Sequence, residues 1–195
     1  MALLLDGGTG SRSAAPLWVD YPDTFTADEC ALLIGLTATL PHKDAGLVDG
    51  KAQADVRRTL IHWLAEDEAT AWVYARLAAV MARANREAFH FALSGFDEDA
   101  QVARYADGHF YDWHIDRGGR GAGRNRKLTV AVQLSDPLAY DGGDLEINPD
   151  GHVALGPRAR GTAMVFPAYA LHRVAPITRG VRHSLVIWAH GPDFT

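Results

Sequence analysis

Residues 101–116 read QVARYADGHFYDWHID, and this stretch indicates the fold of the second half of the chain. It contains two short runs rich in β-branched and aromatic residues, 102–105 and 109–115, with an Ala-Asp-Gly turn between them. Similar runs, bounded by Gly, Asp, Asn or Pro, follow at 127–134, 144–147, 153–155, 162–166, 171–174 and 182–189. Eight short strands separated by turn residues are typical of an all-β sandwich or barrel.

The sequence before residue 101 is predicted to be mainly helical. Thr26 precedes Ala27-Asp28-Glu29, the pattern of an N-cap with acids in the first turn, and the helix should end before Pro41. Apolar residues at helical spacing predict a longer helix over 67–91, and 60–64 has strand character. We therefore expect a mainly β fold with packed helices, in which a helical segment precedes a double-layered barrel and the long helix packs against that barrel.

Length and composition fit one domain. The 195 residues, 48% of them hydrophobic, suffice for one core, so we expect a domain over 17–195 and a flexible arm over the Gly- and Ser-rich residues 1–16. A net charge of -5 gives no support for general binding to nucleic acid or a membrane surface. MALLLDGG lacks the flanks of a signal peptide, no apolar stretch approaches the ~20 residues that cross a bilayer, and the lone Cys30 cannot form an internal disulfide. These features predict a cytoplasmic protein outside the membrane.

His114 and Asp116 lie two residues apart in a run of strand character, so both side chains should project to one face of the sheet and can share a metal. A third ligand must come from elsewhere, and His172 lies 56 residues after Asp116 in a strand-like segment. Two imidazoles and one carboxylate form the facial triad of non-haem iron(II), which leaves three metal positions open. A His-x-Asp pattern alone is weak evidence, and the alternative for His172 is a structural histidine.

The position of Arg182 supports the metal hypothesis. It lies ten residues after His172, and a return through 176–180 would lay its strand beside that of His172, with the guanidinium deeper in the barrel than the metal. A guanidinium there can bind the far carboxylate of a chelating 2-oxo acid such as 2-oxoglutarate, and Ser184 on the same face can add a hydroxyl donor. Dioxygen would take the remaining metal position. The alternative for Arg182 is a solvated arginine at a strand edge.

Three stretches together resemble the prolyl-4-hydroxylase-like branch of the 2-oxoglutarate oxygenases. They are RYADGHFYDWHID at 104–116, LSDPLAYDGGDL at 134–145 and HRVAPITRGVRHSLVIW at 172–188. Collagen-type members have lysine at the position of Arg182, so the chain is more similar to the bacterial and oxygen-sensing members. Halogenating relatives have a small residue in place of Asp116, so the resemblance favours hydroxylation.

The resemblance implies a double-stranded β-helix, the jelly-roll form, with the metal at one mouth and its motifs within residues 101–190. The implied ligands are His114, Asp116 and His172 for iron(II), and Tyr105, Gln133, Arg182 and Ser184 for 2-oxoglutarate. Tyr111 is expected to line the substrate pocket, and ascorbate is an expected reductant. The implied reaction uses dioxygen to hydroxylate an unactivated C–H group of a protein residue, peptide or amino-acid-like substrate, with release of succinate and CO2.

Two other functions remain open from the sequence. A non-catalytic, cupin-like metal-binding or sensor protein would need no buried arginine at position 182. A zinc hydrolase would need a general base beside the metal-bound water, and no residue is assigned to that role.

The stretch from Arg117 to Lys127 follows the His-x-Asp strand and contains four arginines and four glycines. We expect a mobile lid in which Arg120 and Arg124 contact substrate, because glycines make a segment costly to order. The alternatives are a solvated loop and, with less support, an RNA-binding segment. Asp144 and Glu146 alternate on a strand and are candidates for contact with a cationic substrate or a metal ligand, or are solvent-facing.

Overall fold

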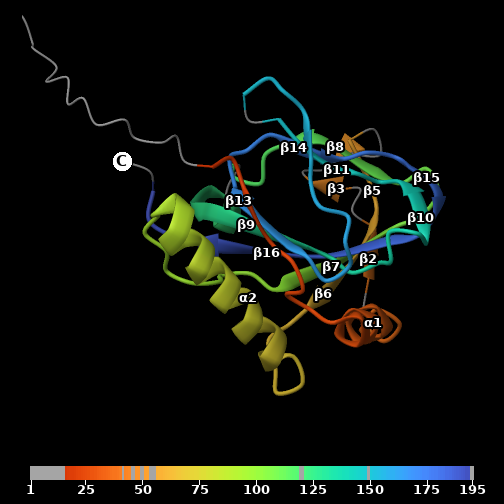
Figure 1. Ribbon diagram of the computed structural model, residues 1–195, viewed down its shortest axis with the longest axis horizontal. Coiled ribbons are helices and arrows are strands. Elements are labelled where there is room, and N and C mark those ends of the chain that lie inside the picture. The colour runs from red at the N-terminus through yellow and green to blue at the C-terminus, as the bar shows by residue number, and fades with distance from the viewer. Residues whose placement is uncertain are drawn as a thin grey trace, which may run out of the picture.

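The chain forms two facing antiparallel β-sheets in a computed structural model that describes residues 16–40, 42–44, 47–48, 51–52, 56–118, 121–148 and 150–193. Figure 1 shows the sheets as two layers, with both labelled helices on the side of the larger sheet. In order, the larger sheet contains β1 (Val19–Tyr21), β13 (Ala163–Pro167), β9 (Arg126–Gln133), β16 (Arg182–His190), β7 (Ala100–Tyr105), β6 (Leu60–Leu64) and β2 (His42–Asp44). The smaller sheet contains β12 (Ala154–Leu155), β11 (Leu145–Ile147), β14 (His172–Val174), β8 (Phe110–His114) and β5 (Arg57–Arg58).

Two shorter pairs complete the architecture. β10 (Tyr140–Gly142) pairs with β15 (Ile177–Gly180) at one end of the two layers, and β3 (Leu47–Val48) pairs with β4 (Lys51–Ala52). The arrangement confirms the expected mainly β fold, a double-stranded β-helix with packed helices. Except for Pro16, the expected arm over residues 1–16 lies outside the described residues.

Helix α1 (Ala27–Leu36) begins where the sequence predicts. The Thr26 side chain accepts a hydrogen bond from the Glu29 backbone N–H, while the Glu29 carboxylate accepts one from the Thr26 N–H, which forms a capping box. The predicted longer helix is shorter than 67–91: α2 (Ala71–Ala84) continues into one π-helical turn, η1 (Asn85–Phe89), and ends at His90 in a left-handed conformation. Within the described ranges, no helix has the length and apolar character to cross a membrane.

The larger sheet separates two cores because its side chains alternate between its faces. One face of the sheet packs against α1 and α2. The core between them includes Leu33, Val73, Leu77 and Met81 of the helices and Leu128, Val130, Val132, Leu185 and Ile187 of the sheet. The other face packs against the smaller sheet, through residues that include Ala103, Tyr105, Ala131, Leu145, Ile147, Met164, Phe166 and Val174. The inward face of β7, β9 and β16 is therefore left to build a site between the sheets.

The return at 176–180 was expected to lay the strand of Arg182 beside that of His172, and this expectation is wrong: β16 and β14 belong to different sheets, and the return contains β15, which pairs with β10. Gly142 (φ 70°) and Gly180 (φ 84°) occupy left-handed conformations that favour glycine, and a Cβ on either would meet backbone atoms of the facing segment. These glycines therefore allow two turn-like segments to pair closely.

Acid should destabilise the fold partly through His183 on β16. Burial, with help from Arg104, His62 and Arg182, lowers the pKa of His183 from 6.5 to about 4. As pH falls below 6.5, His183 therefore binds a proton in the unfolded chain but stays neutral in the folded chain. The contribution of the neutral, buried His183 to the free energy of unfolding is complete above pH 6.5 and is lost as pH falls toward 4. His183→Gln should lessen the loss of unfolding free energy between pH 7 and pH 5 by about 1 to 2 kcal/mol, measured by urea denaturation. Equal acid sensitivity of both proteins would contradict this assignment.

Candidate functional site

A cavity of about 250 Å³ lies between the two sheets and contains residues from both. Its lining includes Gln101, Ala103 and Tyr105 of β7, Thr129 and Ala131 of β9, and Arg182, Ser184, Val186 and Trp188 of β16, together with Arg57, Tyr111, His114, Asp116 and His172 from the opposite side. Because side chains alternate along β7, β9 and β16, the lining residues of these strands all point into the cavity. The polar ones among them form a polar row: Gln101, Tyr105, Thr129, Arg182, Ser184 and Trp188. The three predicted metal ligands and the predicted carboxylate-binding arginine thus share one cavity.

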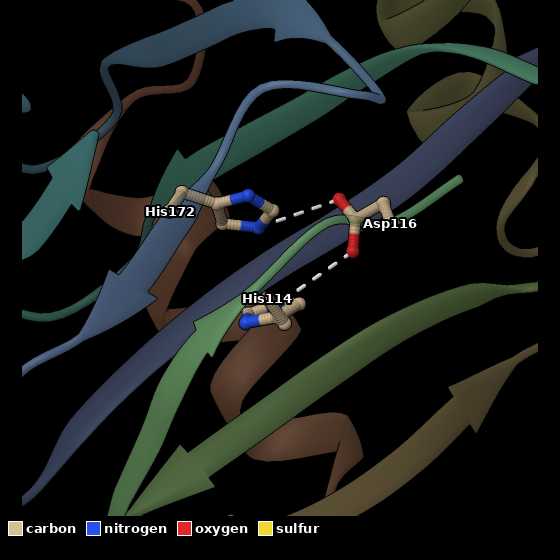
Figure 2. Close-up of side chains that lie close together, drawn as sticks. All are labelled: His114, Asp116 and His172. Carbon is tan, nitrogen blue, oxygen red and sulfur yellow. Dashed lines mark ion pairs between the residues drawn. The ribbon is translucent and has the colours of Figure 1, made fainter. Parts of the chain in front are cut away.

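The antiparallel register of β8 and β14 brings the two histidines together, because His114 and His172 are direct partners across the strands. Their ring centroids are 4.1 Å apart. Asp116 follows β8 and faces both imidazoles with one carboxylate oxygen toward each, as Figure 2 shows: Nε2 of His114 is 3.6 Å from Oδ1, and Nε2 of His172 is 3.5 Å from Oδ2. One ligand atom from each residue lies within 4.8 Å of the others, which is close enough to hold one metal ion.

Both imidazoles are oriented by backbone carbonyls. The His114 Nδ1–H donates to Asp112 O at 2.7 Å and the His172 Nδ1–H donates to Ala170 O at 2.9 Å, because a carbonyl can only accept. The Nε2 lone pairs therefore remain for a metal. Burial lowers the pKa of His172, although Asp116 opposes this effect, and the neutral ring that results is the form that ligates metals.

The Asp116 carboxylate is held in its ionised form. Burial alone would raise its pKa, but the neighbouring His172 and His114 and a 2.7 Å hydrogen bond from the Thr129 hydroxyl outweigh burial and hold the pKa well below the usual range. A carboxylate and two imidazoles whose Nδ1–H groups are held by backbone carbonyls form the donor set of the facial triad. The chemistry of the residues present therefore fits an iron(II) ion.

Arg182 lies at the other end of the polar row and is only 1% exposed. Its guanidinium donates to Gln133 Oε1 at 2.9 Å and to the Ser184 hydroxyl at 3.5 Å, and it lies 5.5 Å from the centroid of the Tyr105 ring. Among the described residues, no carboxylate forms an ion pair with it. Burial of a charge without a counter-charge is costly, so the arrangement fits a site completed by an anionic ligand.

The other predicted site residues divide into two groups. Tyr105, Tyr111 and Ser184 line the cavity, whereas Gln133 is not among its lining residues and contacts Arg182 instead. Tyr111 stacks on the His114 ring at 3.4 Å between centroids.

The Arg117 to Lys127 segment is only partly described, and Arg120 lies outside the described residues. Residues 121–125 form a 3-10 turn, η2 (Gly121–Asn125), in which Arg124 makes two hydrogen bonds to Asp193, at 2.6 and 3.2 Å, and does not line the cavity. Asp144 pairs with Arg158, and Glu146 pairs with Arg173 at 2.9 Å.

A second polar group beside the triad was not identified from the sequence. Arg126 makes two hydrogen bonds to Glu98, at 2.6 and 2.7 Å, packs 3.6 Å over the Trp188 ring and donates to the Asp116 backbone carbonyl at 3.1 Å. The fully buried His190 also contacts Glu98, at 3.0 Å. The Trp188 indole N–H is buried and has no hydrogen-bond partner in the described part of the chain, although its side chain lines the cavity. Of these residues, only Trp188 had a signal in the sequence that could have placed it in the cavity, namely its i, i+2 spacing from the inward-facing residues of β16.

A fold of two antiparallel sheets with a His-Asp-His triad and a buried arginine between them defines the class of non-haem iron oxygenases that use a 2-oxo acid. Comparison with known proteins agrees. Residues 100–190 match the model of the 2OG-Fe(II) oxygenase superfamily. Among curated proteins, a PKHD-type hydroxylase of Maricaulis maris is 46% identical over 45% of this chain, a match that spans only 39% of the relative's length. A PKHD-type hydroxylase of a Caulobacter species is 29% identical over 88% of this chain and 77% of its own.

Solved structures have the same fold. A prolyl-4-hydroxylase of Pseudomonas putida superimposes with a TM-score of 0.72 and 24% identity, covering 89% of this chain and 92% of its own. A prolyl hydroxylase of Trichoplax adhaerens, solved in complex with a peptide fragment of a hypoxia inducible factor, gives 0.73 and 19% identity, covering 89% and 83%. Over residues 100–190 the chain is therefore similar to the 2OG-Fe(II) oxygenase superfamily, and its fold is that of the solved prolyl hydroxylases.

Thr129→Val should weaken metal binding without changing the ligands. The substitution keeps the shape of the side chain but removes the hydroxyl that donates to the Asp116 carboxylate. Loss of a hydrogen bond of this kind costs about tenfold to a hundredfold in metal affinity. Titration of iron(II) against a competing chelator measures the change, and Thr129→Ser, which retains the hydroxyl, should bind as the wild type does. Equal affinity of the valine variant would show that this hydrogen bond does not tune the site.

Proposed function

We propose that the chain is an Fe(II)- and 2-oxoglutarate-dependent dioxygenase that hydroxylates an unactivated C–H group of a protein residue, peptide or amino-acid-like substrate. When bound, the iron with 2-oxoglutarate and dioxygen supplies the oxidising chemistry, with succinate and CO2 as the expected co-products. The observation that carries the proposal is the presence of the His-Asp-His cluster and the uncompensated Arg182 in one cavity. A metal-binding sensor needs no buried arginine, and a zinc hydrolase would need a general base beside the metal-bound water, a role to which no residue is assigned.

The residues of the cavity divide the work between its two ends. His114, Asp116 and His172 are assigned to the metal, and the carbonyl contacts of the two Nδ1 atoms hold the imidazoles in a ligating orientation. At the other end, Arg182 is assigned to the carboxylate of 2-oxoglutarate farthest from the metal, since a guanidinium and a carboxylate form strong charge-assisted hydrogen bonds.

Two further contacts support the carboxylate end. Gln133 is assigned to fix the guanidinium of Arg182, and Ser184 and Tyr105 are assigned to the same end of the cosubstrate because both line the cavity beside Arg182. The cavity also has apolar lining residues, among them Ala131, Leu145 and Phe166, and apolar surroundings strengthen polar contacts.

The substrate is proposed to approach on the side of the triad where Tyr111 lines the cavity. Arg120 and Arg124 remain candidates for substrate contact, and for Arg124 this would require release from Asp193. We also propose that residues 17–195 act as one domain in a reducing, cytoplasmic setting, which the single, buried Cys30 supports.

The activity is tested by incubating the iron-loaded protein with 2-oxoglutarate and candidate peptides or amino acids and measuring succinate by mass spectrometry. His172→Ala should abolish succinate release, because removal of one of three protein ligands destroys both affinity and geometry. His152→Ala, at an exposed histidine, is the matched control and should retain wild-type turnover. Near wild-type turnover by His172→Ala would exclude the triad assignment.

The carboxylate end is tested separately with Arg182→Gln. A charge-assisted pair in a buried site is worth ~1.5 to 3 kcal/mol, so the dissociation constant for 2-oxoglutarate should rise about tenfold to a hundredfold while metal affinity is unchanged. Isothermal titration with a redox-inactive metal in the site measures both quantities. Arg179→Gln, at an exposed arginine on β15, is the control. An unchanged 2-oxoglutarate affinity in Arg182→Gln would assign the cosubstrate to another residue.

A further inference from the structure

Arg57 on the edge strand β5 is a second cation of the cavity that the proposed metal and cosubstrate roles do not use. It pairs in register with Tyr111 of β8, and its guanidinium carbon lies 4.3 Å from the centroid of the Tyr111 ring. The His114 ring stacks on Tyr111 at 3.4 Å. Two planar groups at such distances cannot share one face of a ring, so Arg57 and His114 lie on opposite faces. The guanidinium is therefore one aromatic ring away from a metal-binding imidazole.

One polar atom of Arg57 is not satisfied by the described part of the protein. Its Nε is buried and has no hydrogen-bond partner among the described residues, and none of them forms an ion pair with the guanidinium. The other cations of the cavity differ: Arg126 is neutralised by Glu98, and Arg182 donates to Gln133. A buried donor left without an acceptor costs free energy, and a ligand that supplies an acceptor recovers it.

The charges of the cavity indicate the sign of that ligand. If the proposed function holds, an iron(II) ion and Arg182 together bring three positive charges to the cavity, and a 2-oxoglutarate dianion and Asp116 together bring three negative ones. Glu98 offsets Arg126. One positive charge of the cavity, that of Arg57, is then left without a counter-charge among the described residues. Electrostatic complementarity therefore favours a substrate that brings one negative charge to this position.

We propose that Arg57 binds a carboxylate of the substrate, so that the C–H group to be hydroxylated lies a few bonds from that carboxylate. This inference rests on the proposed function and names its substrate class: an amino acid or peptide recognised through a free carboxylate. Tyr111 separates the anion from the metal site and sets the spacing between the bound carboxylate and the reacting carbon.

The inference is tested by binding, without turnover. The protein is loaded with Zn(II) and the unreactive 2-oxoglutarate analogue N-oxalylglycine, and the twenty common L-amino acids and their C-terminal amides are titrated individually by ligand-observed NMR. At least one acid should bind about tenfold or more tightly than its amide, as a charge-assisted hydrogen bond requires. The amides of aspartate and glutamate keep a side-chain carboxylate, so their binding distinguishes a side-chain anion from a main-chain one.

Variants then assign the preference to one residue. Arg57→Gln should abolish the preference for the carboxylate, and Arg57→Lys, which keeps the charge, should retain part of it. Arg58→Gln is the matched control, because Arg58 is the exposed neighbour on the same strand and should behave as the wild type does. All variants should bind Zn(II) and N-oxalylglycine normally.

Three results would overturn the inference: equal binding of acids and amides by the wild type, binding of none of them, or a carboxylate preference that survives in Arg57→Gln. Weaker binding of N-oxalylglycine by Arg57→Gln would also overturn it, by assigning Arg57 to the cosubstrate. Each of these leaves the proposed dioxygenase standing. Failure of the wild type to bind Zn(II) and N-oxalylglycine together would instead reject the proposed function.

Discussion

The site depends on a buried cation that the described part of the protein does not neutralise. Arg182 is 1% exposed, and its described contacts are the amide of Gln133, the hydroxyl of Ser184 and the ring of Tyr105. Gly143, in a left-handed conformation, packs closely here: a Cβ on it would clash with the Ile177 side chain and come within 3.2 Å of the Arg182 side chain. Such an arrangement is stable when an anion completes it, which links the fold directly to a dicarboxylate cosubstrate.

Strand register extends this constraint to the metal end of the cavity. The direct pairing of His172 with His114 positions two of the proposed ligands, and Thr129 on the facing sheet positions the third through its hydrogen bond to Asp116. The distance between the proposed ligands and Arg182 is therefore set by the separation of two sheets rather than by a mobile loop. A site on paired strands holds its ligands more precisely than one on loops.

Much of this arrangement could be predicted from local patterns. The period-two spacing of His114 and Asp116 placed both side chains on one face, and the Thr26 capping pattern placed the start of α1. Residues whose role depends on long-range pairing could not be found in this way. Arg57 reads as one of two adjacent arginines before a strand, and only its register with Tyr111 shows that it reaches the cavity. Likewise, Glu98 and Arg126 are 28 residues apart and meet only when β7 and β9 are in place.

The most direct test of the central claim is a crystal structure of the protein with a metal and 2-oxoglutarate bound without oxygen, with the metal located by anomalous scattering. The account predicts one metal ion ligated by Nε2 of His114, Nε2 of His172 and the Asp116 carboxylate, with 2-oxoglutarate chelating that ion and its far carboxylate on Arg182. A metal held by other residues, or a 2-oxoglutarate carboxylate that does not contact Arg182, would contradict the account.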